Sequence, residues 1–135
     1  MRAWLASAGA VAAGFLVTAV ASTATDAAMH AAGIFPSSPQ IMSDPLFVLA
    51  SAYRALFTVV GGYTTARLAA RRPMFHAWTL AGIGVIAGLA GLIAYYLIGG
   101  AQLGPAWYAI SIPLEAIPCV WVGARLAVAR RSVAA

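Results

Sequence analysis

Two charged residues lie inside long apolar stretches and are the first candidates for chemistry. Arg54 falls within the apolar run that follows Asp44, and Glu115 falls within the run that follows Pro105. Each lies ten residues into its run, which is about 15 Å along a helix. A lone charge in the middle of a bilayer costs at least about 2.5–3.5 kcal/mol. Since each is the only opposite charge at the other's depth, we predict an Arg54–Glu115 ion pair that joins the second and fourth spans.

Three interpretations of this intramembrane pair are open. The first is a structural link between two helices. In the second, Arg54 turns outward to Asp26 or Asp44, and Glu115 is protonated. In the third, Glu115 is a proton or cation site that Arg54 modulates, because the prolines on either side of Glu115 free backbone carbonyls that a cation could use.

A second group of polar residues, the outer polar cluster, consists of Asp26, His30, Asp44 and Tyr53. Asp26 and His30 are four residues apart, so on a continued first helix they share one face. A carboxylate that orients an imidazole is found in metal sites and proton relays. No third ligand lies nearby in the sequence, so we expect a hydrogen bond between the two side chains and no metal site.

Several chemistries are excluded by residues that the chain lacks. It contains no lysine, which rules out a Schiff base with retinal or pyridoxal phosphate. Its single cysteine, Cys119, rules out an intrachain disulfide and a cysteine metal cluster. We find no glycine-rich phosphate loop, no HExxH motif and no nucleophile–base set. We therefore expect no cofactor and no enzymatic activity.

The composition is typical of a membrane protein. Of the 135 residues, 63% are hydrophobic and 8% are charged, whereas soluble domains are about a quarter charged. A net charge of +5 would suggest nucleic acid binding in a soluble protein. Here seven of the eight arginines lie at the ends of apolar runs, so membrane topology explains them. The expected partner is the lipid bilayer, and no nucleic acid partner is expected.

Four segments are apolar for about the 20 residues that a membrane helix needs. They span about residues 4–24, 46–66, 75–98 and 106–124, and the first can continue as a helix toward residue 32. The segments lack the two-residue alternation of a membrane β-barrel. The sequence therefore predicts one all-α domain over residues 1–135, a polytopic bundle of four transmembrane helices. A cleavable signal peptide is the alternative for the first segment, although its apolar run is long for a signal's core.

The orientation follows from the arginines that flank these segments. They precede the first span, fill the loop between the second and third, and follow the fourth: Arg2, Arg67, Arg71, Arg72, Arg125, Arg130 and Arg131. The other two loops have no basic residue. Basic residues are enriched on the cytoplasmic side, so we expect a multi-pass protein of the bacterial inner membrane with both termini cytoplasmic.

Small residues predict where the helices pack. Gly84, Gly88 and Gly91 share one face of the third span, and Gly62 belongs to a similar stripe on the second. Small residues let transmembrane helices approach closely. Either both stripes pack within one bundle, or one faces outward and contacts a second copy or another membrane protein.

A series of short motifs occurs in order along most of the chain. They are residues 25–36 (TDAAMHAAGIFP), 52–54 (AYR), 61–63 (GGY), 66–69 (ARLA), 72–74 (RPM) and 104–108 (GPAWY). Together they resemble a family of small four-helix bacterial inner-membrane proteins of unknown function, so the resemblance brings no activity with it. It implies that Asp26, His30 and Arg54 belong to a shared pattern. It also implies an apolar residue where this chain has Glu115, which favours Arg54 turning toward the outer acids.

Two functions follow as expectations. The first is a non-enzymatic structural or accessory subunit of a homo-oligomer or a larger membrane complex. It rests on the small size, the absence of catalytic sets and the small-residue faces. The alternative is a small transporter or channel for protons, cations or a small solute that uses the outer polar cluster and Glu115.

Overall fold

The computed structural model describes residues 2–133, and the side chains of residues 5–133. Its described part is all-helical. It contains four long helices and the short 3₁₀-helix η1: α1 (Arg2–Ala31), α2 (Asp44–Leu68), α3 (Pro73–Ile98), η1 (Gly100–Leu103) and α4 (Ala106–Val133). Each long helix carries a stretch of 25 to 28 residues that is apolar enough to cross a membrane. The expected bundle of four membrane helices is confirmed at this level.

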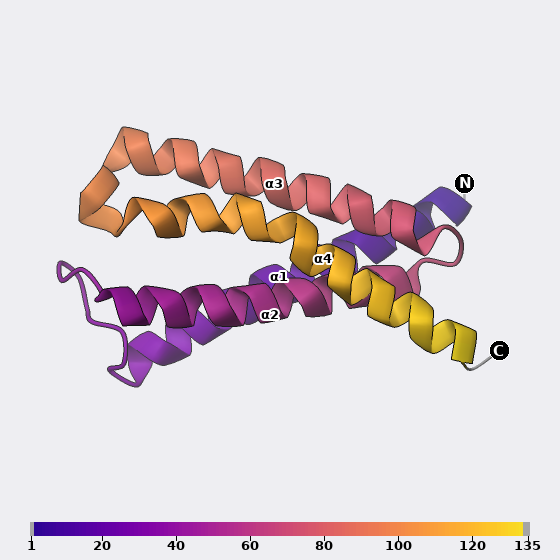
Figure 1. Cartoon of the computed structure of the whole chain (residues 1–135), viewed down its shortest axis with the longest axis horizontal. Helices are drawn as coiled ribbons and strands as arrows, with labels where there is room; N and C mark the ends of the chain where they lie inside the picture. Colours follow the sequence, from indigo (N-terminus) through magenta and orange to yellow (C-terminus); the bar gives the residue numbers. More distant parts are fainter. Residues whose placement is uncertain (1, 134–135) are drawn as a thin grey trace.

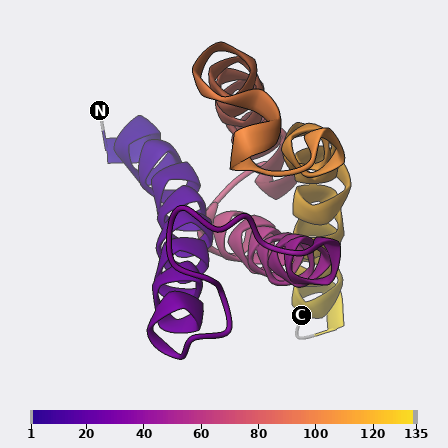
Figure 2. The same ribbon diagram turned by 90° about the vertical axis from the view of Figure 1, so that its left-hand side faces the viewer.

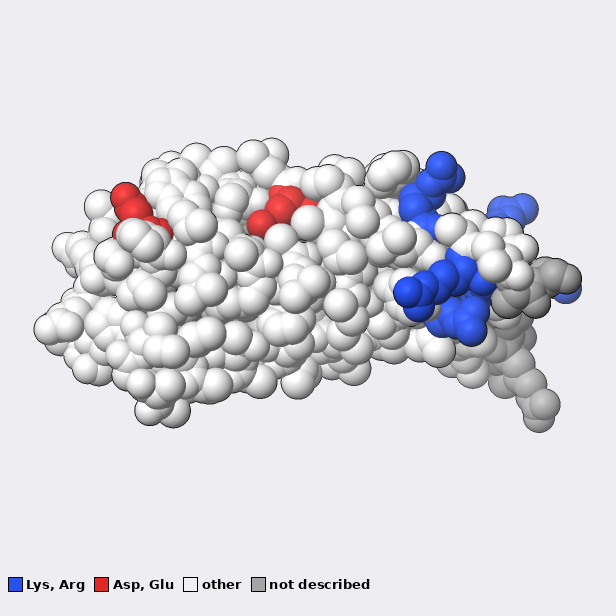
Figure 3. Space-filling view, turned by 60° about the horizontal axis from the view of Figure 1, so that its bottom comes forward, with Lys and Arg blue, Asp and Glu red and all other residues white. Residues whose placement is uncertain are grey.

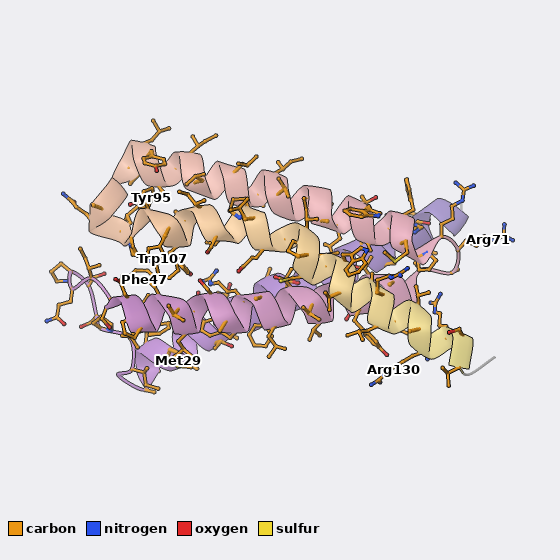
Figure 4. The ribbon with its side chains drawn as sticks, in the orientation of Figure 1. Met29, Phe47, Arg71, Tyr95, Trp107 and Arg130 are labelled. Atoms are coloured by element: carbon orange, nitrogen blue, oxygen red, sulfur yellow. The ribbon has the colours of Figure 1, made fainter. Side chains whose placement is uncertain are left out.

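The two ends of the bundle differ in charge and in connection. The N-terminus, the C-terminus and the turn between α2 and α3 lie at one end, and the loop of residues 32–43 and η1 lie at the other (Figure 1). On the face seen in Figure 3, the basic side chains gather at the first of these ends. Figure 4 places Arg71 and Arg130 there, and Tyr95 and Phe47 toward the opposite end. We call these the arginine end and the loop end.

The helix boundaries have local causes. Gly33 stops α1 with a φ of 71°, which glycine adopts without strain. The N–H of Ile34 then donates to the carbonyl of Met29 at 3.0 Å. α2 begins at Asp44 with a proline in its first turn, and the acid lies near the positive end of the helix dipole. α3 also begins with a proline, Pro73.

The most extensive helix contact joins α2 to α4 and depends on glycine. A Cβ atom at Gly62 would lie 2.4 Å from the carbonyl oxygen of Val120. A Cβ at Gly123 would lie 1.9 Å from the carbonyl oxygen of Val59. The two backbones therefore touch, as small residues allow in membrane helices.

The other contacts divide the bundle into two pairs. α1 packs on α2 where a Cβ at Gly14 would lie 2.5 Å from the carbonyl oxygen of Gly61. α3 packs on α4 where a Cβ at Gly88 would lie 2.8 Å from the Cα of Pro113. Contacts between α1 and α3 are sparse. Figure 2 looks onto the loop end and shows these two helices diverging toward it.

The hydrophobic core is larger at the arginine end of the bundle than at the loop end. A cluster drawn from all four helices fills the bundle from the arginine end to about its middle: Val11, Ala66, Ala77, Leu80, Ala81, Val120, Ala124 and Ala127. At this end Arg131 donates to the carbonyl of Ala69 at 3.1 Å and so joins α4 to the α2–α3 turn. Toward the loop end the second cluster is smaller and is centred on Phe35, Ala50 and Tyr53.

A cavity between four helices and its charged residues

Asp26 of α1 is held by two consecutive residues of α2. The hydroxyl of Tyr53 donates to Oδ1 of Asp26, and Nη2 of Arg54 donates to Oδ2. Tyr53 is buried, while the side chains of Arg54 and Asp26 are 29% and 30% exposed. The positive charge of Arg54 is therefore compensated within the bundle by an acid of the neighbouring helix.

The expected Arg54–Glu115 ion pair is wrong. Within the described part of the chain, Arg54 pairs with Asp26 and forms no ion pair with Glu115. The reason is that α1 continues as a helix to Ala31, which carries Asp26 to the level of Arg54. Close packing of α1 on α2 also brings the two residues together. Across this contact the hydroxyl of Thr18 donates to the carbonyl of Phe57 at 3.2 Å. Of the two outer acids considered above, Arg54 has turned to Asp26.

The remaining members of the outer polar cluster lie apart. The His30 ring is exposed and meets the edge of Phe35, with ring centroids 5.5 Å apart. The expected Asp26–His30 hydrogen bond is wrong: the His30 ring lies against Phe35, and the described donors to Asp26 are Tyr53 and Arg54 of α2. Asp44 is exposed in the first turn of α2. In residues 2–133, no three His, Cys, Asp or Glu side chains are grouped as a metal site would require.

A cavity of about 510 Å³ lies between the helices on the loop side of the main core. All four helices line it, and most of its wall is apolar. Small-molecule sites are typically mostly apolar cavities of about 300–1,000 Å³ that carry a few polar groups. The two charged residues on this wall are Arg54 and Glu115. The structure thus brings the two intramembrane charges to one cavity without pairing them.

Both charged residues present unsatisfied groups. Glu115 is half-buried and makes no hydrogen bond or ion pair with another described residue. Nε of Arg54 is buried and lacks a hydrogen-bond partner in the described chain. An unpaired polar group away from water is costly. The Glu115 carboxylate therefore gives the cavity wall a polar group that the described part of the protein does not pair.

The cavity is closed on one side and open on another. Leu80 and Val120, which are 4% and 3% exposed, form its floor toward the arginine end. On the side between α1 and α3 the lining residues are exposed, with Phe15 at 40% and Ala87 and Gly91 also accessible. The cavity therefore opens sideways, between the two helices that diverge.

The predicted packing glycines have different positions. On α3, Gly84 and Gly88 face Ala116 and Pro113 of α4, whereas a Cβ at Gly91 would meet no described atom within 4 Å. Gly91 instead lines the cavity. Gly62 of α2 also packs on α4. The two small-residue stripes thus both contact α4 within the bundle.

The sequence did not predict some of the residues that join the helices. Gly14 and Thr18 of α1 are four residues apart and pack against α2 at Gly61. This spacing of small residues was a readable signal for the α1–α2 contact. The hydroxyl of Tyr95 donates to the carbonyl of Gly104 at 2.9 Å and joins α3 to the segment before α4. No sequence signal identifies that bond.

Comparison with known proteins adds no relative. No family model matches the chain, and no curated protein or solved structure does either. The resemblance to small four-helix inner-membrane proteins therefore stays a prediction.

Proposed function

We propose that the chain is a small transporter of the bacterial inner membrane that binds its solute in the cavity between the four helices. The observation that carries this proposal is the position of Arg54 and Glu115 on the wall of one cavity within the apolar part of the bundle. Ionisable residues within membrane spans generally mark ion or substrate pathways. The solute enters from the loop end or from the side between α1 and α3.

The proposed orientation has both termini in the cytoplasm. It is supported by the arginines gathered at the end that also holds the termini (Figure 3), since cytoplasmic loops carry an excess of arginine and lysine. In this orientation the cavity faces the outer side and the packed core closes it toward the cytoplasm. That is the geometry of one state of an alternating-access cycle.

A purely structural role explains the cavity less well. An unpaired charge near mid-bilayer costs about 2.5–3.5 kcal/mol or more. A structural helix bundle would be more stable with an apolar residue in place of Glu115. A carboxylate on a cavity wall is better explained by a ligand that contacts it.

An accessory-subunit role is the second candidate, and one observation favours it. A second groove, of about 520 Å³, runs along the same α1–α3 side toward the arginine end and is almost wholly apolar. A helix of a second copy of this chain would cover it in an oligomer. Mass measurement after gentle detergent extraction tests this role, and a strictly monomeric particle contradicts it.

Solute release from proteoliposomes tests the transport proposal. The vesicles are loaded with three labelled small organic solutes, an amine, a carboxylate and a neutral alcohol, and release is compared with protein-free vesicles. We expect faster release of at least one solute. Gly91→Leu places a side chain in the cavity and should return release to the protein-free rate.

Gly82→Leu is the matched control for this experiment. Gly82 lies on the same helix, a Cβ there would also meet no described atom within 4 Å, and Gly82 does not line the cavity. Release by Gly82→Leu should equal that of the parent protein. The proposal fails if no solute is released faster than from empty vesicles, or if the two variants behave alike.

A further inference from the structure

We propose that the cavity takes a monovalent organic cation with apolar substituents, and that the Glu115 carboxylate is its counter-ion. This inference rests on the proposed function and names the class of solute. It follows from the charges around the cavity, the chemistry of its wall and the direction of its opening.

One of the two carboxylates near the cavity has no counter-charge from an ion pair. Asp26 and Arg54 form an ion pair and compensate each other. Glu115 lines the same cavity and forms no ion pair with the described side chains of residues 5–133. With all three groups ionised, one negative charge remains, and a single monovalent cation would neutralise it. Charges removed from water are stable only when they are paired in this way.

An anion fits the same site poorly. Arg54 already donates through Nη2 to Asp26, and its Nε is buried. A bound anion would have to share the Arg54 guanidinium with Asp26 and would add a negative charge beside Glu115. Like charges in a low-dielectric site repel strongly.

The wall favours an organic cation over a metal ion. Calcium and magnesium need about six oxygen ligands or a retained water shell, and the described residues hold no group of three candidate ligands. The aromatic side chains of Phe15, Tyr95 and Tyr108 line the cavity instead. Aromatic rings attract organic cations through their negative faces and contact apolar substituents favourably.

The sideways opening suits a molecule that enters through the membrane. The lining residues between α1 and α3 are exposed, and they are apolar or small: Phe15, Ala87 and Gly91. A cation with apolar substituents partitions into the bilayer and reaches this opening without crossing a polar surface. Small hydrated ions do not have that route.

Two probes of similar shape and opposite charge test the inference. Radiolabelled tetraphenylphosphonium and tetraphenylborate are dialysed to equilibrium against the full chain in detergent, with protein-free micelles as the blank. We expect the phosphonium cation to bind above the blank and the borate anion not to. Glu115→Gln should weaken binding of the cation by at least about tenfold, since it removes the charge partner of the bound cation.

Asp44→Asn is the matched control, because it removes one negative charge from the exposed start of α2, away from the cavity lining. It should leave cation affinity unchanged. If Glu115→Gln fails to fold, Glu115→Asp keeps the carboxylate and should retain binding, while Glu115→Ala should lose it. Tighter binding of the borate, or equal effects of Glu115→Gln and Asp44→Asn, would overturn the inference.

The outcome also separates this inference from the proposed function. If cation binding does not depend on Glu115 while Gly91→Leu still blocks release of another solute, the solute class is wrong and the transport proposal stands. If the phosphonium does not bind and no solute is released, both proposals fall.

Discussion

Asp26 determines the chemistry of the loop end. Its carboxylate accepts one hydrogen bond from Tyr53 and one from Arg54, so it neutralises the arginine and also fixes its direction. A bidentate carboxylate with two donors is geometrically well defined, and charge-assisted hydrogen bonds are stronger than neutral ones. Because Arg54 forms its ion pair with Asp26, the Glu115 carboxylate lines the cavity without forming an ion pair to a described side chain. The Tyr53 hydroxyl is the accessory contact that holds this arrangement in place.

Tyr53→Phe should therefore destabilise the protein, because it removes a hydrogen bond to a charged group. We expect a loss of about 1.5–3 kcal/mol in the free energy of unfolding, measured by denaturation in mixed detergent micelles. Tyr96→Phe is the control, since Tyr96 is 63% exposed and a surface change of this kind stays within about 0.5 kcal/mol. Equal losses in the two variants would show that the Tyr53 hydroxyl has no such bond.

The sequence predicts part of this site and could not predict the rest. An arginine inside an apolar run must find an acid, and this requirement was readable from Arg54 alone. Which acid it finds depends on how far α1 continues as a helix and how it is rotated against α2. Neither follows from hydropathy, so Glu115 was chosen in place of Asp26. The cavity forms between residues of all four helices. The sequence around Glu115 therefore could not predict it.

The helices themselves were more predictable than their contacts. The four apolar runs are long and are bounded by proline, glycine and arginine, so their existence and order follow from the sequence. α4 extends nine residues beyond the predicted limit at residue 124, to Val133. The hydropathy criterion counted apolar residues, while arginine is also a good helix former and prolongs the helix past the span. The sequence could not predict which helix packs against each small-residue stripe, because every helix carries small residues.

The contact of α2 with α4 gives a prediction about a glycine that the sequence analysis did not select. Gly123→Ala should destabilise the bundle by about 1–3 kcal/mol or more. The new Cβ would lie 1.9 Å from the carbonyl oxygen of Val59 and 2.7 Å from the N atom of Tyr63. Both are backbone atoms, so the helices must separate. The measurement is again the free energy of unfolding in micelles.

Gly82→Ala provides the comparison, since it adds the same methyl group to open space on α3. It should be neutral or stabilising by up to about 1 kcal/mol, because alanine is the better helix former. A Gly123→Ala protein as stable as Gly82→Ala would mean that α2 and α4 do not touch at this point.

The molecule as a whole separates charge along its length. Apart from Arg54, the arginines with described side chains lie at one end, and the acids lie in the other half or near the middle (Figure 3). The same end that carries the arginines is tightly packed, whereas the loop end diverges and holds the cavity. If the arginine end is cytoplasmic, the packed core closes the bundle toward the cytoplasm, and the cavity lies in the outer half with its opening between α1 and α3.

Cysteine labelling in intact cells tests this orientation. In a Cys119→Ala background, Ser37→Cys places a thiol in the exposed loop of residues 32–43, and Ala70→Cys places one in the exposed α2–α3 turn. A membrane-impermeant maleimide should label Ser37→Cys in intact cells and Ala70→Cys only after the membrane is opened. The reverse pattern would place both termini outside.

Glu115 is available to a solute in the cavity only if Arg54 forms its ion pair with Asp26. Double-mutant cycles measure this through the free energy of unfolding of Asp26→Asn, Glu115→Gln and Arg54→Gln, alone and in pairs. We predict that the coupling energy of Arg54 with Asp26 exceeds its coupling with Glu115 by at least about 1 kcal/mol, because ion-paired residues typically couple by 0.5–3 kcal/mol. A larger coupling of Arg54 with Glu115 would contradict the account, since the carboxylate proposed to bind the solute would already be paired.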